Sequence, residues 1–293
     1  FFYSIARIMK NYPLIAHHHG NDPPTLKYDF YYGKNKFNKI TRLPLISIRR
    51  MFDSLVMENI DHYLTVGIGS AKYALKFLSP ERVSLFNGGT NFEVMKPISK
   101  NSARQKLDLH LDKKIILTVG PTTEIKGSDV AIEVFSILRE KIPNLELIWV
   151  GDKINKHGSL KKLKDSGIKC VGRKDRDKEL PFYYNSADLY VNLATHPSLT
   201  DIGGINNAII EALGCNTPVI SMKLKNFKNT KLISNLGSLP SNKNDIINCI
   251  INFLENYPDD FESRKYVKKY YSWPSIIKDL DLKYKKLFNR YYN

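Results

Sequence analysis

Two patterns of apolar residues alternate along this chain: short continuous runs, and residues spaced three or four positions apart. Short, largely apolar runs at 114–119, 145–150 and 189–193 are typical of strands that are buried on both faces of a sheet. Between the first two runs, the apolar residues from 130 to 138 recur every three or four positions, which predicts one face of an amphipathic helix. Strands that alternate with helices in this way predict a parallel sheet with helices packed on it.

The alternation occurs on both sides of a short linker, Lys96–Lys100. Before the linker, strands are predicted at 13–16, 62–66 and 83–86, and helices at the amino terminus, at 46–59 and up to Leu78. After it, further strands are predicted at 170–171 and 217–220, and further helices at 160–166, 180–185, 205–212, 246–254, 261–271 and 273–291. The fold class is therefore α/β, with two doubly wound parallel-sheet (Rossmann-like) domains, the first of them partial. We expect domains at 1–98 and 99–272, and a final segment at 273–293 that forms a separate helix.

One stretch, DIGGINNAIIEALGCNTPVIS at 201–221, combines a glycine loop, a short helix and a buried strand. Gly203 and Gly204 let the backbone approach a ligand closely, because neither has a Cβ. The helix that follows leaves its first N–H groups unpaired, and together with the helix dipole these groups predict a phosphate site. Glu211 on this helix is a candidate acceptor for the vicinal hydroxyls of a sugar. The alternative is an ordinary αβ unit with a solvated Glu211.

Three histidines, His17, His18 and His19, follow the first predicted strand and precede Gly20. Open α/β sheets bind ligands at the carboxyl ends of their strands, so one of these side chains is expected to face a cleft. A metal site is the alternative, but consecutive residues of an extended segment point to opposite faces, so at most two of the three share a ligand. No D-x-D-like carboxylate cluster occurs, and no metal is expected.

The composition narrows the choice of partner and compartment. The 293 residues carry a formal net charge of +16, which favours an anionic partner: a membrane surface, a nucleic acid or a phosphorylated substrate. No run approaches the roughly 18 to 20 apolar residues that span a bilayer. Three widely spaced cysteines suit a reducing compartment. The chain begins without Met inside an amphipathic pattern, as expected of a fragment, and the segment 21–43 mixes aromatics with lysines, as either a membrane-facing or a plain surface loop would.

Several segments in order resemble one family: VGPTTEIKG at 119–127, PNLELIWVGD at 143–152, ELPFYYNSADLYVNLA at 179–194, and GGINNAIIEALGCNTPVIS at 203–221. The chain resembles the retaining, nucleotide-sugar-dependent glycosyltransferases of the GT-B fold, family 4 (glycosyl transferases group 1). The resemblance covers nearly the whole chain. It also implies that roughly the first third of a typical member, with its glycine-rich loop, is missing, and that the last helix crosses back onto the first domain.

The resemblance implies roles for individual residues. Lys126 matches the lysine that neutralises the donor diphosphate, and His19 matches the cleft histidine near the donor sugar and the acceptor; these two are the expected catalytic residues. Glu211 matches the second Glu of the E-x7-E motif, which binds the nucleotide ribose. The amides near Asn206 and Asn207 match the helix start that faces the diphosphate. The full expected donor-binding set is Gly120, Lys126, Arg173, Gly203, Gly204, Ile205, Asn206, Asn207 and Glu211.

Two positions depart from the family pattern. The first Glu of E-x7-E falls at Gly203, and the usual Arg after the first strand falls at Pro121, which carries no charge. Losing one of two cations at a diphosphate removes a charge-assisted contact of roughly 1.5–3 kcal/mol. Arg173, Lys174 and Arg176 are candidate replacements for that cation, and Asp201 is a candidate for the lost carboxylate if the loop shifts.

The expected function is transfer of a sugar from a UDP- or GDP-linked donor to an acceptor hydroxyl with retention of configuration, in glycan, glycolipid or cell-surface polysaccharide synthesis. The donor is a substrate, and no separate cofactor is expected. The partners are then the nucleotide sugar, a lipid-linked or glycan acceptor and an anionic membrane surface, with the protein at the cytoplasmic face. The first alternative is a non-catalytic GT-B scaffold or binding protein, which Gly203 and Pro121 favour. A nucleic-acid-binding protein is the second, and only the charge favours it.

Overall fold

The structure, a computed structural model, describes residues 13–18, 57–86, 88–152, 159–194, 206–221, 242–256 and 261–292. The chain divides into two compact units. The first comprises Phe1–Asn87, Ile202–Gly204 and Ile277–Asn293, and the second comprises Gly88–Asp201 and Ile205–Ile276. The predicted amino-terminal helix, the segment 21–43 and most of the predicted helix at 46–59 lie outside the described residues.

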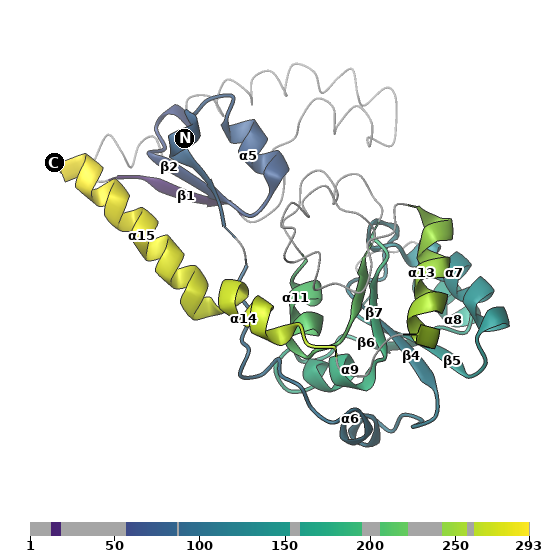
Figure 1. Cartoon of the computed structure of the whole chain (residues 1–293). Helices are drawn as coiled ribbons and strands as arrows, with labels where there is room; N and C mark the ends of the chain where they lie inside the picture. The colour runs from purple at the N-terminus through teal and green to yellow at the C-terminus, as the bar shows by residue number, and fades with distance from the viewer. Residues whose placement is uncertain are drawn as a thin grey trace, which may run out of the picture. The chain divides into compact units, whose positions relative to one another are not determined.

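The described part of the first unit contains a parallel sheet of order β1-β2-β3 (Figure 1). Its elements are β1 (Ile15–His18), β2 (His62–Thr65), α5 (Ile68–Ala74), the 3-10 turn η1 (Pro80–Arg82) and β3 (Val83–Leu85). All four residues of the central strand β2 are buried. The segment from Ile277 onward, most of the terminal helix α15 (Trp273–Tyr292), also belongs to this unit, and Tyr284 lies 2.5 Å from the His17 ring nitrogen Nε2.

The second unit contains a five-stranded parallel sheet of order β6-β5-β4-β7-β8. The strands are β4 (Lys114–Val119), β5 (Leu145–Val150), β6 (Lys169–Gly172), β7 (Leu189–Asn192) and β8 (Val219–Ser221). The longest register, between β4 and β5, runs from Lys114 opposite Leu145 to Val119 opposite Val150. Because all these pairings are parallel, the carboxyl ends of the strands meet at one edge.

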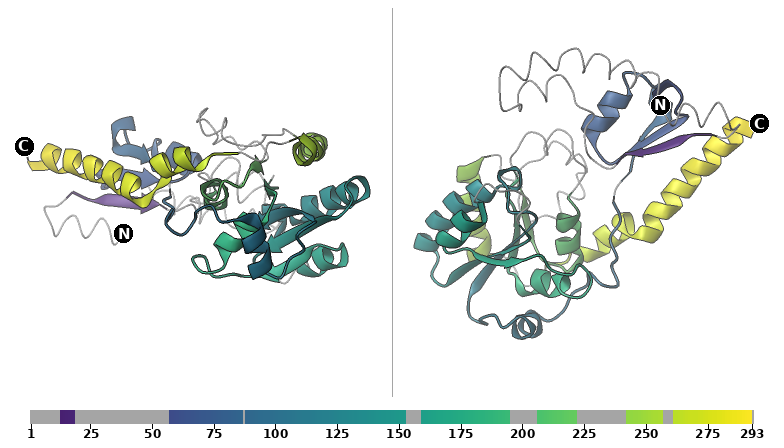
Figure 2. Two further views of the ribbon diagram at one scale, coloured as in Figure 1. Left: turned by 60° about the horizontal axis from the view of Figure 1, so that its bottom comes forward. Right: turned by 180° about the vertical axis from the view of Figure 1, so that it is seen from behind.

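Helices cover both faces of this sheet, as the views in Figures 1 and 2 show. The helical elements are α6 (Lys100–Lys106), η2 (Glu124–Lys126), α7 (Ser128–Lys141), α8 (Ser159–Asp165), α9 (Leu180–Ser186), α11 (Asn207–Gly214), α13 (Lys243–Asn256), α14 (Arg264–Tyr271) and the start of α15. One core, with Phe135 and Trp149, packs α7, α8 and α13 against the sheet. The other, with Tyr184, Tyr190 and Leu213, packs α9, α11 and α14 against the opposite face.

The predicted fold class, α/β with Rossmann-like parallel sheets, is confirmed. The predicted helices and strands of the second unit are found with small shifts at their ends. The sequence pattern did not predict helix α6, which begins at Lys100, the last residue of the predicted linker. Ser99 caps it, accepting a hydrogen bond from the Ser102 N–H, and Ala103 and Arg104 are buried. Within the described residues, no helix combines the length and the apolar character that crossing a bilayer requires.

Arg104 joins α6 to the amino edge of the sheet. It is 3% exposed, and its guanidinium donates to the backbone carbonyls of Ser186, Leu111 and Lys113. Its remaining nitrogen lies 2.8 Å from Asp188 Oδ2. That carboxylate also accepts from the Ile115 N–H of β4 and, at Oδ1, from the half-exposed Lys100. One buried arginine thus fixes α6 and the starts of β4 and β7.

We expect Arg104→Met to destabilise the chain by about 3–5 kcal/mol, because it leaves three carbonyls and a largely buried carboxylate without their donor. Lys100→Met is the matched control: it removes an exposed partner of the same carboxylate and is expected to cost less than about 1 kcal/mol. Urea unfolding of both variants measures the two losses. Equal losses would mean that the Arg104–Asp188 contact does not hold this edge together.

Candidate functional site

A hollow of about 300 Å³ lies at the carboxyl edge of the second unit's sheet. Its walls are Val119, Gly120, Pro121, Val150, Gly151, Asp152, Arg173, Lys174 and Leu180. These residues follow three neighbouring strands, β4, β5 and β6, and include the start of α9. Ligands of open parallel sheets bind at this edge, so the hollow is the first candidate for a binding site.

Gly151 sets the close packing of the two strand ends that form this hollow. Its φ is +149°, and a Cβ at this position would lie 2.0 Å from the Gly120 carbonyl oxygen. The Gly151 N–H donates to the Gly172 carbonyl, and Asp152 accepts a hydrogen bond from the Arg173 N–H at 2.8 Å. The rim after β5 is therefore tied to the loop after β6 by both backbone and side chain.

The two cations in the hollow's wall differ in their surroundings. Lys174 lies 3.4 Å from Glu179, and its ammonium is 5.8 Å from the centre of the Tyr183 ring. The exposed guanidinium of Arg173 forms no hydrogen bond or ion pair within the part of the chain that the structure describes. Pro121, the position where the family pattern has Arg, lines the same hollow. An unpaired cation thus lies in the wall that lacks the usual one.

Lys126 lies beside the hollow, at the end of η2. The Lys126 N–H donates to the Thr123 carbonyl, and Gly127 turns the chain into α7 with a φ of +83°. The lysine stem passes Gly120, where a Cβ would lie 3.8 Å from Lys126 Cγ and Cδ. Burial lowers the pKa of the Lys126 ammonium, and among the described residues nothing pairs with it. A partly buried cation without a partner favours an anionic ligand.

Glu211 is buried, and both of its carboxylate oxygens have partners. Oε2 accepts a hydrogen bond from the Tyr184 hydroxyl at 2.8 Å. Oε1 accepts from Arg176, at 2.8 Å from Nε and 2.6 Å from a terminal nitrogen. The interpretation of Glu211 as a solvated residue of an ordinary αβ unit is wrong, because this side chain is only 6% exposed. A buried carboxylate needs such donors to stay ionised.

Two buried tyrosines lie against this carboxylate from within the core. The Tyr184 and Tyr190 rings meet edge to face, with centroids 5.9 Å apart. Burial and the neighbouring Glu211 raise the pKa of both hydroxyls, so both stay protonated, and Tyr184 remains a donor. Burial also raises the pKa of the Cys215 thiol to about 12, so this cysteine is not a nucleophile at neutral pH. Of these three side chains, Tyr184 is the one that bonds to Glu211.

The start of α11 is described from Asn206 onward. The Asn206 side chain accepts a hydrogen bond from the Ala208 N–H at 3.2 Å and caps the helix itself. The side chain of Asn207 is exposed. Lys126, Asn206 and Asn207 do not line the hollow after β4–β6. The expected sharing of one hollow between Lys126 and the α11 amides therefore stays a prediction.

Several expected site residues lie outside the described residues: His19, Asp201, Gly203, Gly204 and Ile205. Their roles stay predictions. His17, the neighbour of His19 in the three-histidine run, contacts the rings of Phe86 and Tyr284 within the first unit. Among the described residues, no group of histidine, cysteine and carboxylate side chains could hold a metal ion.

Sequence reasoning did not find the two residues that hold Glu211. Arg176 was considered only as a replacement cation for the diphosphate, and Tyr184 was not considered at all. They lie 35 and 27 positions before Glu211. No local pattern connects them; only the packing of α9 against α11 in one core brings them to the same carboxylate.

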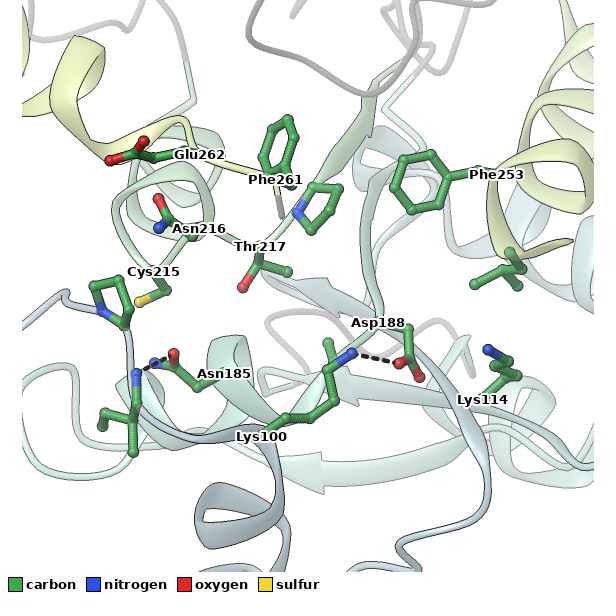
Figure 3. A pocket seen from close by; sticks show the side chains of 15 residues that line it. Lys100, Lys114, Asn185, Asp188, Cys215, Asn216, Thr217, Phe253, Phe261 and Glu262 are labelled. Carbon is green, nitrogen blue, oxygen red and sulfur yellow. Dashed lines mark hydrogen bonds and ion pairs between the residues drawn. The ribbon is translucent and has the colours of Figure 1, made fainter. Parts of the chain in front are cut away.

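A second cavity, of about 450 Å³, lies at the opposite, amino edge of the same sheet (Figure 3). Phe253 and Phe261 form part of its wall, and Lys100 crosses it to reach Asp188. This carboxylate is already neutralised by Lys100 and Arg104. The cavity is thus bounded by the contact that fixes α6, away from the strand ends that bear Gly120 and Gly151.

Residues 113–256 match the family described as Glycosyl transferases group 1. Among curated proteins, the chain is similar to a D-inositol 3-phosphate glycosyltransferase of Thermobispora bispora, with 27% identity over 190 residues. That alignment covers 60% of this chain and 43% of the relative, so the chain spans less than half the length of this protein.

Two solved structures share the fold over nearly all of the chain. Sucrose-phosphate synthase from Thermosynechococcus elongatus has a TM-score of 0.72 at 20% identity, covering 98% of this chain and 70% of its own. Anabaena HepE, solved in complex with UDP, also has a TM-score of 0.72, at 14% identity, covering 97% and 75%. The match at 113–256 makes this part of the chain similar to the glycosyl transferases group 1 family, and the shared architecture shows the GT-B fold.

Proposed function

We propose that the protein transfers a sugar from a nucleoside-diphosphate donor, UDP- or GDP-linked, to an acceptor hydroxyl with retention of configuration. The observation that carries this proposal is Lys126: a partly buried ammonium without a partner among the described residues, beside the hollow at the carboxyl edge of the sheet. A diphosphate supplies the missing counter-charge. It also becomes more negative as the glycosidic bond breaks, so a cation at this position stabilises the transition state more than the bound donor.

We assign the remaining parts of the donor to further residues. The apolar walls of the hollow, Val119, Val150 and Leu180, suit the flat face of a nucleobase. Glu211 is the acceptor for the ribose hydroxyls, and the amides from Gly203 to Asn207 are donors to the phosphates. No separate cofactor or metal enters the proposal, because Lys126 and the amides provide the positive charge. UDP in HepE, a protein of the same fold, supports a nucleotide ligand.

Retention is proposed to follow from attack on the face that the leaving group vacates. The phosphate oxygen that loses the sugar accepts the proton of the acceptor hydroxyl, so the leaving group is the base. Lys126 stabilises the charge on that phosphate. His19 is the proposed catalytic residue on the acceptor side. Glycan, glycolipid or cell-surface polysaccharide synthesis is the proposed setting.

Contact with the cytoplasmic face of an anionic membrane is part of the proposal. The net charge of +16 and the exposed apolar residues Ile277 and Phe288 on α15, which lie among lysines, favour this contact. Cys170, Cys215 and Cys249 form no disulfide with one another, as suits a reducing compartment.

A non-catalytic GT-B protein that binds a nucleotide sugar without turnover is the second candidate function. Two positions favour it: Pro121 lines the hollow without a charge, and Gly203 carries no carboxylate. The two candidates share the binding site and differ in turnover. Measuring binding and transfer separately therefore distinguishes them.

We expect Lys126→Met to weaken binding of uridine or guanosine diphosphate about tenfold or more, because a charge-assisted contact is lost. The same change is expected to leave the free chain as stable or to raise its unfolding free energy by about 1 kcal/mol, because a desolvated charge is removed. Titration calorimetry and urea unfolding measure the two effects. Lys141→Met, at the exposed end of α7, is the matched control and is expected to change neither. Unaltered nucleotide binding in Lys126→Met would remove this lysine from the site.

The lowered pKa of Lys126 also predicts a pH dependence. The folded, ligand-free chain binds the Lys126 proton more weakly than the unfolded chain does. At low pH the ammonium is charged in both states, so the free-energy cost of burying the charge is greatest there. Stability is regained between the lowered pKa and the ordinary value of 10.5. Diphosphate binding favours the ammonium, so we expect affinity to fall as the pH rises through that window. The slope should disappear in Lys126→Met; an equal slope in both chains would assign it to another group.

We expect the protein to be stabilised by nucleoside diphosphates, by about 2.7 kcal/mol at 100 times the dissociation constant. A thermal-shift panel of uridine and guanosine nucleotide sugars identifies the base. Donor hydrolysis and transfer, with the anomeric configuration of the product read by NMR, then test turnover. Binding without turnover supports the non-catalytic candidate, and an inverted product would contradict the proposed mechanism.

A further inference from the structure

The two partners of Glu211 differ in how easily they can leave it. Tyr184 is fully buried, and its hydroxyl reaches Oε2 from inside the core. Arg176 reaches Oε1 from the solvent side, and its side chain is 48% exposed. Removing Tyr184 from the carboxylate would require opening the core, whereas Arg176 can exchange its contact for water.

The guanidinium covers the oxygen that a ligand would need. Two nitrogens of Arg176 lie within 2.8 Å of Glu211 Oε1, while the carboxylate itself is only 6% exposed. Tyr184 approaches Oε2 from inside the core, so a sugar hydroxyl that reaches the carboxylate from the solvent side and donates to Oε1 must displace Arg176. Arg176 and a sugar diol therefore compete for one side of the carboxylate.

The backbone that carries Arg176 is fixed by its own turn. Asp175 accepts hydrogen bonds from the N–H groups of Asp177 and Lys178, at 3.0 and 2.8 Å. In return, the Asp175 N–H donates to Glu179 Oε2 at 2.9 Å. Release of Glu211 thus requires only a rotation of the Arg176 side chain into solvent, with no movement of the loop.

We propose that Arg176 is a specificity-determining residue of the donor site: it occupies Glu211 Oε1 until the vicinal 2′- and 3′-hydroxyls of a ribose displace it. The inference rests on the proposed function, because it takes the ligand to be a nucleoside diphosphate. It assigns the ribose-binding carboxylate two states. One is covered by Arg176, and the other is open to a diol, with Tyr184 bound in both.

Arg176 should affect the binding of ribonucleotides and of dideoxynucleotides differently. A ribonucleotide that binds through Glu211 must break the contact with Arg176. A 2′,3′-dideoxynucleotide has no hydroxyl to offer and leaves the contact in place. Arg176 therefore lowers the preference for ribonucleotides over dideoxynucleotides, and its removal raises that preference.

The test compares Arg176→Ala with the wild-type chain, using uridine and guanosine diphosphates and their 2′,3′-dideoxy counterparts as probes. The ratio of dideoxy to ribo dissociation constants, measured by titration calorimetry, is expected to rise about three- to tenfold in the variant. The ratio cancels the general loss of one positive charge near the phosphates. Lys178→Ala removes a charge from the same turn without touching Glu211 and should leave the ratio unchanged.

Arg176→Lys tests the inference independently in case Arg176→Ala does not fold. It keeps the charge but loses the two-nitrogen contact, so a ratio between those of wild type and Arg176→Ala supports the inference. An unchanged or reduced ratio in a folded Arg176→Ala chain overturns it, because Arg176 then does not cover the carboxylate or itself contacts the ribose. A wild-type chain that binds none of the four nucleotides overturns the proposed function and this inference together; nucleotide binding with an unchanged ratio overturns the inference alone.

Discussion

Burying a carboxylate costs free energy unless donors compensate it, and the donors of Glu211 connect several elements of the second unit. They bring together α9, which supplies Tyr184, the turn before α9, which supplies Arg176, and α11, which carries Glu211 itself. The apolar residues of α9 and α11 pack in one core around this contact. The fold therefore fixes the position of the Glu211 carboxylate before any ligand binds.

The opposite situation holds at Lys126, whose ammonium has no partner among the residues that the structure describes. Desolvation of an ammonium costs free energy in the ligand-free chain, and the lowered pKa of Lys126 expresses that cost. The stem of this lysine lies along Gly120, and Gly151 brings the next strand end against the same glycine. The close packing that forms the hollow thus also removes water from the lysine. A bound anion therefore stabilises this desolvated ammonium by more free energy than it would stabilise a solvated one.

The sequence predicted what depends on local pattern. Apolar runs and helical periodicity predicted the parallel sheet of the second unit and most of its helices. The motif around Lys126 and Glu211 indicated the family whose model matches residues 113–256. The sequence did not predict α6, whose only local signal is the cap at Ser99 in a segment taken as a linker. Nor did it predict that Glu211 is buried, because the helical period fixes a face but does not show which distant side chains cover it. The roles of His19 and the glycine loop at 203–204 rest on the sequence alone, because these residues lie outside the described ones.

The positive charge left for a ligand at this site depends on which individual cations are paired, and not on the net charge of the chain. Four cations of the second unit are candidates for binding the donor phosphates: Lys126, Arg173, Lys174 and Arg176. Two of them are compensated by carboxylates, Lys174 by Glu179 and Arg176 by Glu211. The other two, Lys126 and Arg173, have no carboxylate partner among the described residues; Arg173 lines the hollow with Pro121, and the stem of Lys126 passes Gly120. A nucleoside diphosphate sugar carries two negative charges, which two uncompensated cations balance without the arginine that Pro121 replaces. The formal net charge of +16 gives the protein a general preference for anions. The pairing of individual side chains at this edge determines how much negative charge a bound ligand should carry.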